Sequence, residues 1–348
     1  MTPIIGLNYF FGDSERNDGF MREDAVGAIR VARELKIRLE REYDVEVHGW
    51  DCIDWHSERV KAVLYLDCSW RSILNDPFLK LIPKRKRAVY LIEPNNVNPA
   101  LYFLPFFRNR FSTVFTWDQR LLDRNPSYLP INVLPGVAPQ AYRENRFSEI
   151  RFAEKKLLFA ASSNRWHYLP QSTFGKRRRV YSWFDRRLPD RFDLYGEKWN
   201  EPIVWYEKIF GYPRYRCWRG FLPGGFEAKV EKMAHYRFAI CFENNASEPG
   251  YISEKIIDCL CARCVPIYLG SEGTEKRIPR DCYIDFRDFK SLADLENHIV
   301  GMDEDTYERY QKAIEEFLNS PAADFFTSEY NLRCIARGLG LSPRVRSV

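Results

Sequence analysis

Apolar runs and polar, turn-forming segments alternate along the whole chain. Runs rich in β-branched and aromatic residues predict buried strands at residues 4–10, 45–47, 62–66, 88–92, 111–117, 156–161, 193–196, 238–242 and 267–269. Between several of them, apolar residues recur with helical spacing, which predicts helices within residues 25–43, 180–184, 254–264 and 303–318. Strands that alternate with helices in this way are typical of an α/β protein with parallel sheets.

A polar stretch without periodicity divides this pattern. From Gly136 to Glu154 the chain is charged and irregular, as in a linker. With 348 residues, each half is long enough to bury its own core. We therefore predict one domain over residues 1–150, a second over residues 151–325 and a short carboxy-terminal tail over residues 326–348.

The most informative stretch runs from Phe238 to Gly270. An apolar strand leads into a polar loop, and a helix follows. Ser253 suits the N-cap of this helix, because its hydroxyl can accept a free N–H group of the first turn. Pro266 is expected to close the helix before the next strand.

The loop of this stretch lies where parallel sheets bind ligands, beyond the carboxyl end of a strand. The helix start offers free N–H groups and a partial positive charge, to which Lys255 adds a full charge. Glu254 supplies a carboxylate that can bind sugar hydroxyls. The stretch thus suits a nucleotide diphosphate, although its spacing alone fits a surface turn with a solvated Glu–Lys pair equally well.

Three blocks of this stretch resemble the donor-binding signature of the alpha-1,3/4-fucosyltransferases. They are Phe242-Glu243-Asn244, Gly250-Tyr251-Ile252-Ser253-Glu254-Lys255 and Val265-Pro266-Ile267-Tyr268-Leu269-Gly270. Their order and spacing are near those of the family. Asn245 stands where Ser or Thr is usual, and Ser253 replaces Thr, but both keep small polar chemistry. The resemblance covers residues 156–318 well and the first half of the chain only loosely.

Two further residues take a role from this resemblance. Glu93 follows the strand 88–92, where the fucosyltransferases carry their proposed general base; by itself it fits a turn cap better. In the run KRRR, residues 176–179, Arg177 aligns with the family's arginine on the donor pyrophosphate, and Arg178 is the second choice. Taken alone, such a run is more often a solvated helix start or part of a nucleic-acid patch. The segment NYFFGD, residues 8–13, is similar to the opening of bacterial members.

The resemblance implies a GT-B fold, in which two Rossmann-like domains face a central cleft. It implies an inverting transfer of L-fucose from GDP-fucose to a hydroxyl of N-acetylglucosamine or glucose, through an alpha-1,3 or alpha-1,4 linkage. The acceptor would be an oligosaccharide or glycolipid, as in protein or lipopolysaccharide glycosylation. Glu93 would act as the base, and the donor would be bound by Arg177, Asn244, Tyr251, Glu254 and Lys255.

The same resemblance implies that no metal is required, a divalent ion being at most stimulatory. Asp303-Glu304-Asp305 matches a D-x-D metal motif, but acidic residues are common in a first helical turn. Two alternatives stay open. One is a transferase that uses another GDP-sugar, and the other is a protein of the same fold that binds sugar nucleotides or carbohydrates without catalysis.

Composition does not decide between these functions, but it bears on partners, location and the state of the cysteines. The net charge of +5 is mild, and the basic runs 84–87 and 176–179 lack interleaved aromatic residues, so we expect no nucleic-acid partner. Apolar runs fall short of the roughly 18–20 residues of a membrane span, so we expect a cytoplasmic protein with peripheral membrane contact at most. The nine cysteines lack disulfide or zinc spacing, which predicts reduced thiols, and Cys259, Cys261 and Cys264 are expected to pack in the core.

Overall fold

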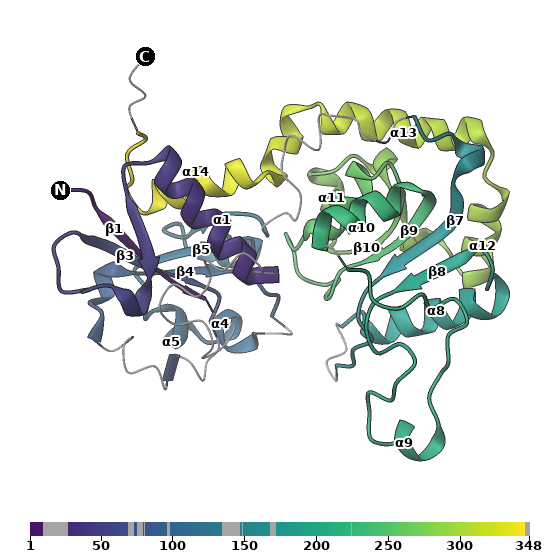
Figure 1. Ribbon diagram of the computed structural model, residues 1–348, viewed down its shortest axis with the longest axis horizontal. Helices are drawn as coiled ribbons and strands as arrows, with labels where there is room; N and C mark the ends of the chain where they lie inside the picture. The colour runs from purple at the N-terminus through teal and green to yellow at the C-terminus, as the bar shows by residue number, and fades with distance from the viewer. Residues whose placement is uncertain are drawn as a thin grey trace. The chain divides into compact units, whose positions relative to one another are not determined.

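The computed structural model describes residues 1–9, 27–68, 73–74, 79, 81–95, 98–133, 147, 149–167, 172–223 and 225–344. Residues 10–13 of the NYFFGD segment and residues 136–146 of the expected linker lie outside these ranges. The chain divides into two compact units (Figure 1), one made of residues 1–134 together with 328–348 and the other of residues 135–327.

A six-stranded sheet forms the centre of the first unit. All neighbouring strands run parallel, in the order β2-β1-β3-β4-β5-β6. The central strands are buried along almost their whole length, as expected when both faces of a parallel sheet are covered. The strands are β1 (Ile4–Tyr9), β2 (Glu46–Gly49), β3 (Val60–Leu66), β4 (Arg87–Leu91), β5 (Thr113–Thr116) and β6 (Leu129–Pro130). The described helices are α1 (Gly27–Glu42), α4 (Pro99–Phe103), α5 (Pro105–Arg108), α6 (Gln119–Arg124) and α14 (Ser328–Gly338).

Helix α14 joins the first unit although it follows the whole second unit in sequence. Its buried Asn331 donates a side-chain N–H to the hydroxyl of Tyr90 in β4 (3.3 Å). A Cβ on Gly338 would lie 2.5 Å from side-chain atoms of Phe115 and Leu129, so the helix end approaches the sheet more closely than any other residue would allow. The segment expected to be a tail therefore contains a helix that packs on this sheet, and the amino-terminal part of the unit ends at residue 134.

A five-stranded parallel sheet, in the order β11-β10-β9-β7-β8, forms the centre of the second unit. Helices α10 and α11 pack on each other and against β9, and α8 packs against β8 (Figure 1). The strands are β7 (Lys156–Ala161), β8 (Phe192–Tyr195), β9 (Tyr236–Phe242), β10 (Val265–Leu269) and β11 (Ile284–Asp285). The helices are α8 (Phe174–Arg187), α9 (Glu207–Phe210), α10 (Gly225–Ala234), α11 (Glu254–Cys261), α12 (Leu292–Gly301) and α13 (Glu304–Leu318). The predicted α/β class with parallel sheets is confirmed in both units.

The prediction that Pro266 closes α11 was wrong. The helix ends at Cys261, and Arg263 turns the chain with a φ of 52°, in the left-handed region. The carbonyl of Arg263 accepts hydrogen bonds from the ammonium group of Lys155 (2.6 Å) and from the hydroxyl of Tyr307 (3.1 Å). Pro266 lies inside β10. Contacts with residues far away in sequence, not the proline, thus fix this turn.

Two other predictions concern the chain as a whole. Within the described ranges, every helix is too short or too polar to span a lipid bilayer. The nine cysteines are free, and those around α11 are buried in the core of the second unit, namely Cys241, Cys259, Cys261 and Cys264. The predicted core packing of Cys259, Cys261 and Cys264 is confirmed, whereas Cys52 is exposed.

Candidate functional site

The end of β9 and the start of α11 meet at the carboxylate of Glu243. This residue follows β9 directly and is fully buried. Its carboxylate accepts the backbone N–H (2.8 Å) and the hydroxyl (2.6 Å) of Ser253, and the hydroxyl of Tyr268 (3.3 Å). Ser253 is the N-cap of α11, as predicted, because its Oγ accepts the N–H of Lys255 (3.4 Å). The helix start is therefore held at the carboxyl end of a central strand, where parallel sheets bind ligands.

Lys255 and Glu254, the first two residues of α11, form a charged pair at this helix start. The Lys255 Nζ lies 3.0 Å from Ser253 Oγ, 3.5 Å from Glu243 Oε2 and 3.6 Å from Glu254 Oε1. Burial by itself lowers the pKa of Lys255, but the carboxylates of Glu254 and Glu243 outweigh it and the pKa is raised. Lys255 likewise overcomes the effect of burial on Glu254 and lowers its pKa. Both groups are charged at neutral pH, and about a quarter of each side chain is exposed (26% and 22%).

Arg177, in the first turn of α8, reaches the same strand end. It is buried and donates to the carbonyl of Phe242 and to Oδ1 of Asn244 (3.0 Å). Burial lowers the pKa of its guanidinium group. Arg178, the second choice, instead forms an ion pair with Glu207. Of the two arginines, only Arg177 thus lies at the end of β9.

A third cation, Lys229 of α10, shares a pocket with Arg177 and Lys255. The pocket has a volume of about 40 Å³ and is also lined by Ser162, the residue after β7. Lys229 forms an ion pair with the buried carboxylate of Asp258 in α11. Burial lowers the pKa of Lys229, but Asp258 reverses this effect and the pKa is raised. Sequence reasoning missed Lys229, because an isolated lysine on a helix is usually a solvated side chain.

The loop between β9 and α11 is joined to the start of α8. The N–H of Thr173 donates to the carbonyl of Asn244 (3.2 Å). Asn245, which departs from the family pattern, is fully buried and donates its side-chain N–H to Oε1 of Glu248 (2.6 Å). Tyr251, at the end of the loop, is only 3% exposed. The structure therefore brings Asn244 beside Arg177, and it places the Tyr251 side chain in the interior of the unit.

Glu93 lies in the first unit, just beyond the carboxyl end of β4. Its backbone N–H donates to Oδ2 of Asp67 (2.8 Å), and its carbonyl accepts the hydroxyl of Tyr102 (2.6 Å). Asp67 follows β3 and is buried; burial, with a smaller contribution from the charge of Glu93, raises its pKa to about 6. The main chain at Glu93 is thus fixed on both sides, while its side chain is half-buried. The sequence did not indicate a role for Asp67, whose carboxylate holds this turn by accepting the N–H of Glu93.

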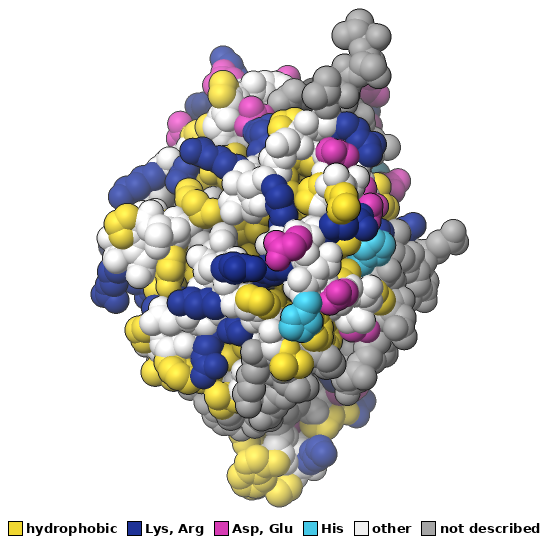
Figure 2. Space-filling view, turned by 90° about the vertical axis from the view of Figure 1, so that its left-hand side faces the viewer, with side chains coloured by type: hydrophobic (Ala, Val, Ile, Leu, Met, Phe, Trp, Pro, Cys, Tyr) yellow, Lys and Arg dark blue, Asp and Glu magenta, His cyan; other side chains and the backbone are white. Residues whose placement is uncertain are grey.

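Neither basic run forms an exposed stripe. Lys86 and Arg87 are buried and donate to backbone carbonyls of neighbouring loops. Arg177 and Arg178 are occupied as described above. On the face drawn in Figure 2, basic side chains are dispersed among hydrophobic and uncharged groups. Half of each run is thus occupied within the fold, whereas Lys84, Arg85, Lys176 and Arg179 are exposed.

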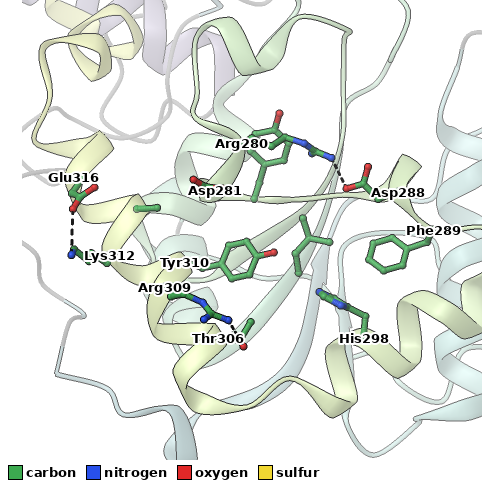
Figure 3. A pocket seen from close by; sticks show the side chains of 13 residues that line it. Arg280, Asp281, Asp288, Phe289, His298, Thr306, Arg309, Tyr310, Lys312 and Glu316 are labelled. Atoms are coloured by element: carbon green, nitrogen blue, oxygen red, sulfur yellow. Dashed lines mark hydrogen bonds and ion pairs between the residues drawn. The ribbon is translucent and has the colours of Figure 1, made fainter.

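A larger pocket, of about 810 Å³, lies beside the edge strand β11, between α12 and α13. Figure 3 shows Tyr310 on one side of it and Phe289 and His298 on the other. Its basic and acidic lining residues are equal in number, three of each, and Arg280 is paired with Asp288 (2.5 Å). Because these charges cancel, the larger pocket does not suit a diphosphate. The cationic pocket at the start of α11 is therefore the better candidate for a diphosphate site, although it is smaller.

Asp303 of the D-x-D motif caps α13 by accepting the N–H of Thr306 (2.8 Å). Within the described ranges, no three His, Cys, Asp or Glu side chains are grouped to hold a metal ion.

Comparisons with known proteins match the part of the chain that contains α11. Residues 212–327, which include the loop and α11, match the family described as glycosyltransferase family 10 (fucosyltransferase) C-term. The alpha-(1,3)-fucosyltransferase FucT of Helicobacter pylori is 35% identical over 81 residues, which is 23% of this chain and 17% of that protein. The human 3-galactosyl-N-acetylglucosaminide 4-alpha-L-fucosyltransferase FUT3 is 32% identical over 120 residues, 32% of each chain. The chain thus matches no more than about a third of the length of these curated relatives.

Solved structures show the same fold over nearly the full length. An alpha1,3-fucosyltransferase crystallised with GDP-fucose has a TM-score of 0.53 and 16% identity, and the likeness covers 100% of this chain and 93% of that one. A DNA-modifying beta-glucosyltransferase has a TM-score of 0.58 and 11% identity, over 97% of this chain and 100% of that one. At such identities the likeness concerns the fold alone. It confirms the predicted GT-B class, with its two parallel-sheet α/β domains.

Proposed function

The chain belongs to glycosyltransferase family 10, the fucosyltransferases, and on this premise we propose that it transfers L-fucose from GDP-fucose to a sugar hydroxyl. The acceptor would be N-acetylglucosamine or glucose in an oligosaccharide or glycolipid. The linkage would be alpha-1,3 or alpha-1,4, formed with inversion in the cytoplasm. The observation that carries the proposal is the single pocket shared by Arg177, Lys229 and Lys255 at the start of α11.

The charge of this pocket suits the leaving group of such a transfer. As the bond to fucose breaks, negative charge develops on the GDP diphosphate. The start of α11 supplies free N–H groups and the positive end of the helix dipole. Lys255 and Lys229, both with raised pKa values, and Arg177 add full charges. Glu243 fixes the helix start and Lys255, Asp258 pairs with Lys229, and Asn244 accepts from Arg177, so these groups are in position before the donor binds.

The remaining donor contacts follow from the same arrangement. Glu254, ionised and partly exposed, would accept hydrogen bonds from the ribose hydroxyls. Asn244, beside Arg177, and Tyr251, in the interior below the loop, would shape the sugar-nucleotide pocket. Asn245 and Glu248 would keep the loop in this conformation.

Glu93 would act as the general base. It would take the proton of the acceptor hydroxyl while that oxygen attacks the anomeric carbon of fucose. Its half-buried side chain and fixed main chain suit this role, because a base must keep both its orientation and its access to the acceptor. Asp67, which accepts the Glu93 N–H, would be a positioning residue.

A donor and acceptor panel tests the proposal. The purified protein is incubated with GDP-fucose, other GDP-sugars and UDP-sugars, each with type 1 and type 2 disaccharides, and products are identified by mass spectrometry. We expect fucosylated disaccharide and free GDP from GDP-fucose alone. Faster transfer from another GDP-sugar would correct the donor, and tight GDP binding without any transfer would indicate a binding protein.

The proposed mechanism does not need a metal ion, since three protein cations face the diphosphate. Addition of EDTA should therefore slow transfer only slightly. Complete loss of activity with EDTA, restored by a divalent ion, would contradict this part of the mechanism.

A further inference from the structure

Among the described residues of the second unit, the three most exposed hydrophobic side chains lie in one projecting turn, residues 205–210, which we call the aromatic tip. Trp205 is 70% exposed, Ile209 67% and Phe210 82%, although side chains of this kind are usually buried. Helix α9 forms the end of a long loop that extends away from the helices and sheet of its own unit (Figure 1). Contiguous apolar surface of this kind commonly marks an interaction site.

The aromatic tip is a fixed structure. The buried carboxylate of Glu207 accepts the backbone N–H groups of Ile203 (2.8 Å) and Val204 (3.3 Å), and it pairs with Arg178 of α8. These contacts outweigh the effect of burial and lower the pKa of Glu207. A buried ion pair thus holds the loop so that the apolar side chains beside it point into solvent.

Positive charge surrounds these apolar side chains. Lys208, Arg214 and Arg216 are exposed, whereas Glu207, the only acidic residue between positions 205 and 216, is buried in its ion pair. Tryptophan and phenylalanine flanked by lysine and arginine are typical of segments that bind at the interface of a lipid bilayer. Cations next to such a segment are attracted to anionic lipid headgroups.

We propose that the aromatic tip docks on an anionic lipid bilayer. Trp205, Ile209 and Phe210 insert among the headgroups, and Lys208 and Arg214 contact the phosphates. A projecting turn of six residues can enter a deformable lipid interface, whereas it offers too small a surface for a stable protein interface, which buries about 800 Å² per partner. The proposal stands independently of the proposed transfer reaction.

Vesicle co-sedimentation tests the proposal with the full chain. The probes are vesicles of phosphatidylcholine alone and vesicles with about 30 mol% phosphatidylglycerol. We expect binding to the anionic vesicles. The double variant Ile209→Ser/Phe210→Ser should lower the partition coefficient at least about tenfold, because its apolar contacts with lipid are lost. The variant Lys208→Glu/Arg214→Glu should lower it about fivefold or more per charge on anionic vesicles only.

A matched control is available in the first unit. Phe106 is 56% exposed, but the guanidinium group of Arg110 lies 4.5 Å from the centre of its ring. Phe106→Ser should bind vesicles like the wild type, and all variants should keep the wild-type unfolding temperature and GDP affinity. The proposal is overturned if the wild type binds neither kind of vesicle, or if Ile209→Ser/Phe210→Ser binds as the wild type does. A wild-type dimer that this variant converts to a monomer, without lipid binding, would instead assign the tip to a second copy of the chain.

Discussion

Each unit of this protein places a glutamate just beyond the carboxyl end of a central parallel strand, but the two glutamates have different surroundings. Glu243 follows β9, is fully buried and accepts hydrogen bonds from Ser253 and Tyr268 through its carboxylate. Glu93 follows β4, and Asp67 and Tyr102 hold its backbone atoms, while its side chain is half-buried. The carboxylate of Glu243 therefore supports the structure, whereas the partly exposed Glu93 is the residue that we propose as the general base.

The place of a residue in a sheet therefore does not decide its role. Both glutamates stand where parallel sheets bind ligands. A carboxylate that holds a helix start and a neighbouring lysine cannot exchange a proton with a substrate without loss of those contacts. The burial of each residue, not its position, underlies the different roles that we assign to the two glutamates.

The largest effect is expected for Glu93→Gln, which removes the proposed base. Turnover should fall by about 10²–10⁴-fold, because an amide cannot take the acceptor proton. GDP affinity and the unfolding temperature should stay unchanged. The control is Glu46→Gln in β2, a partly exposed glutamate that pairs with Arg59 (2.7 Å). An active Glu93→Gln enzyme would remove Glu93 from the mechanism and end the contrast with Glu243.

Glu243→Gln should instead affect stability and binding together. Loss of one partner from a buried ion pair costs about 3–5 kcal/mol in the free energy of unfolding, and the start of α11 loses its anchor. We therefore expect an unfolding transition at lower urea concentration and weaker GDP binding. Ser253→Ala, which removes only the N-cap hydroxyl, should cost about 1 kcal/mol. If Glu243→Gln unfolds like the wild type, the carboxylate does not support the helix.

Gly338→Ala tests whether α14 is part of the unit that carries Glu93. The new methyl group would meet Phe115 and Leu129 at 2.5 Å, so the free energy of unfolding should fall by about 1–2 kcal/mol. Gly301 is the matched control, since it also ends a helix and a Cβ there has no neighbour within 4 Å. Equal stability of the two variants would show that α14 does not pack tightly on β5.

The smallest effect is expected for Lys229→Met/Asp258→Asn, which removes the third cation together with its partner. Replacement of both members of a buried ion pair is often nearly neutral for stability, so the protein should stay folded. GDP affinity should fall about three- to tenfold, less than for a full charge-assisted contact, because Asp258 already offsets much of the charge of Lys229. Titration calorimetry measures it. An unchanged affinity would make the pair purely structural.

The sequence was sufficient for those parts of the molecule that depend on local patterns. The strands around the site, the N-cap Ser253 and the positions of Glu93 and Lys255 follow from hydrophobic runs, capping chemistry and a family resemblance. Features that depend on distant contacts were not predictable. Asn331 and Tyr90 are 241 residues apart in sequence, and the turn at Arg263 is held by Lys155 and Tyr307. The role of Lys229 likewise appears only when α10 is placed beside α11.

We propose that the start of α11, with Lys255, binds the two phosphates of a nucleotide diphosphate. Titration calorimetry of GDP and GMP with the wild type and Lys255→Ala tests it most directly. We expect the variant to lose at least about tenfold in GDP affinity, because one charge-assisted contact with the second phosphate is worth about 1.5–3 kcal/mol. GMP affinity should change little. Equal losses for GDP and GMP, or unchanged GDP binding, would contradict the account.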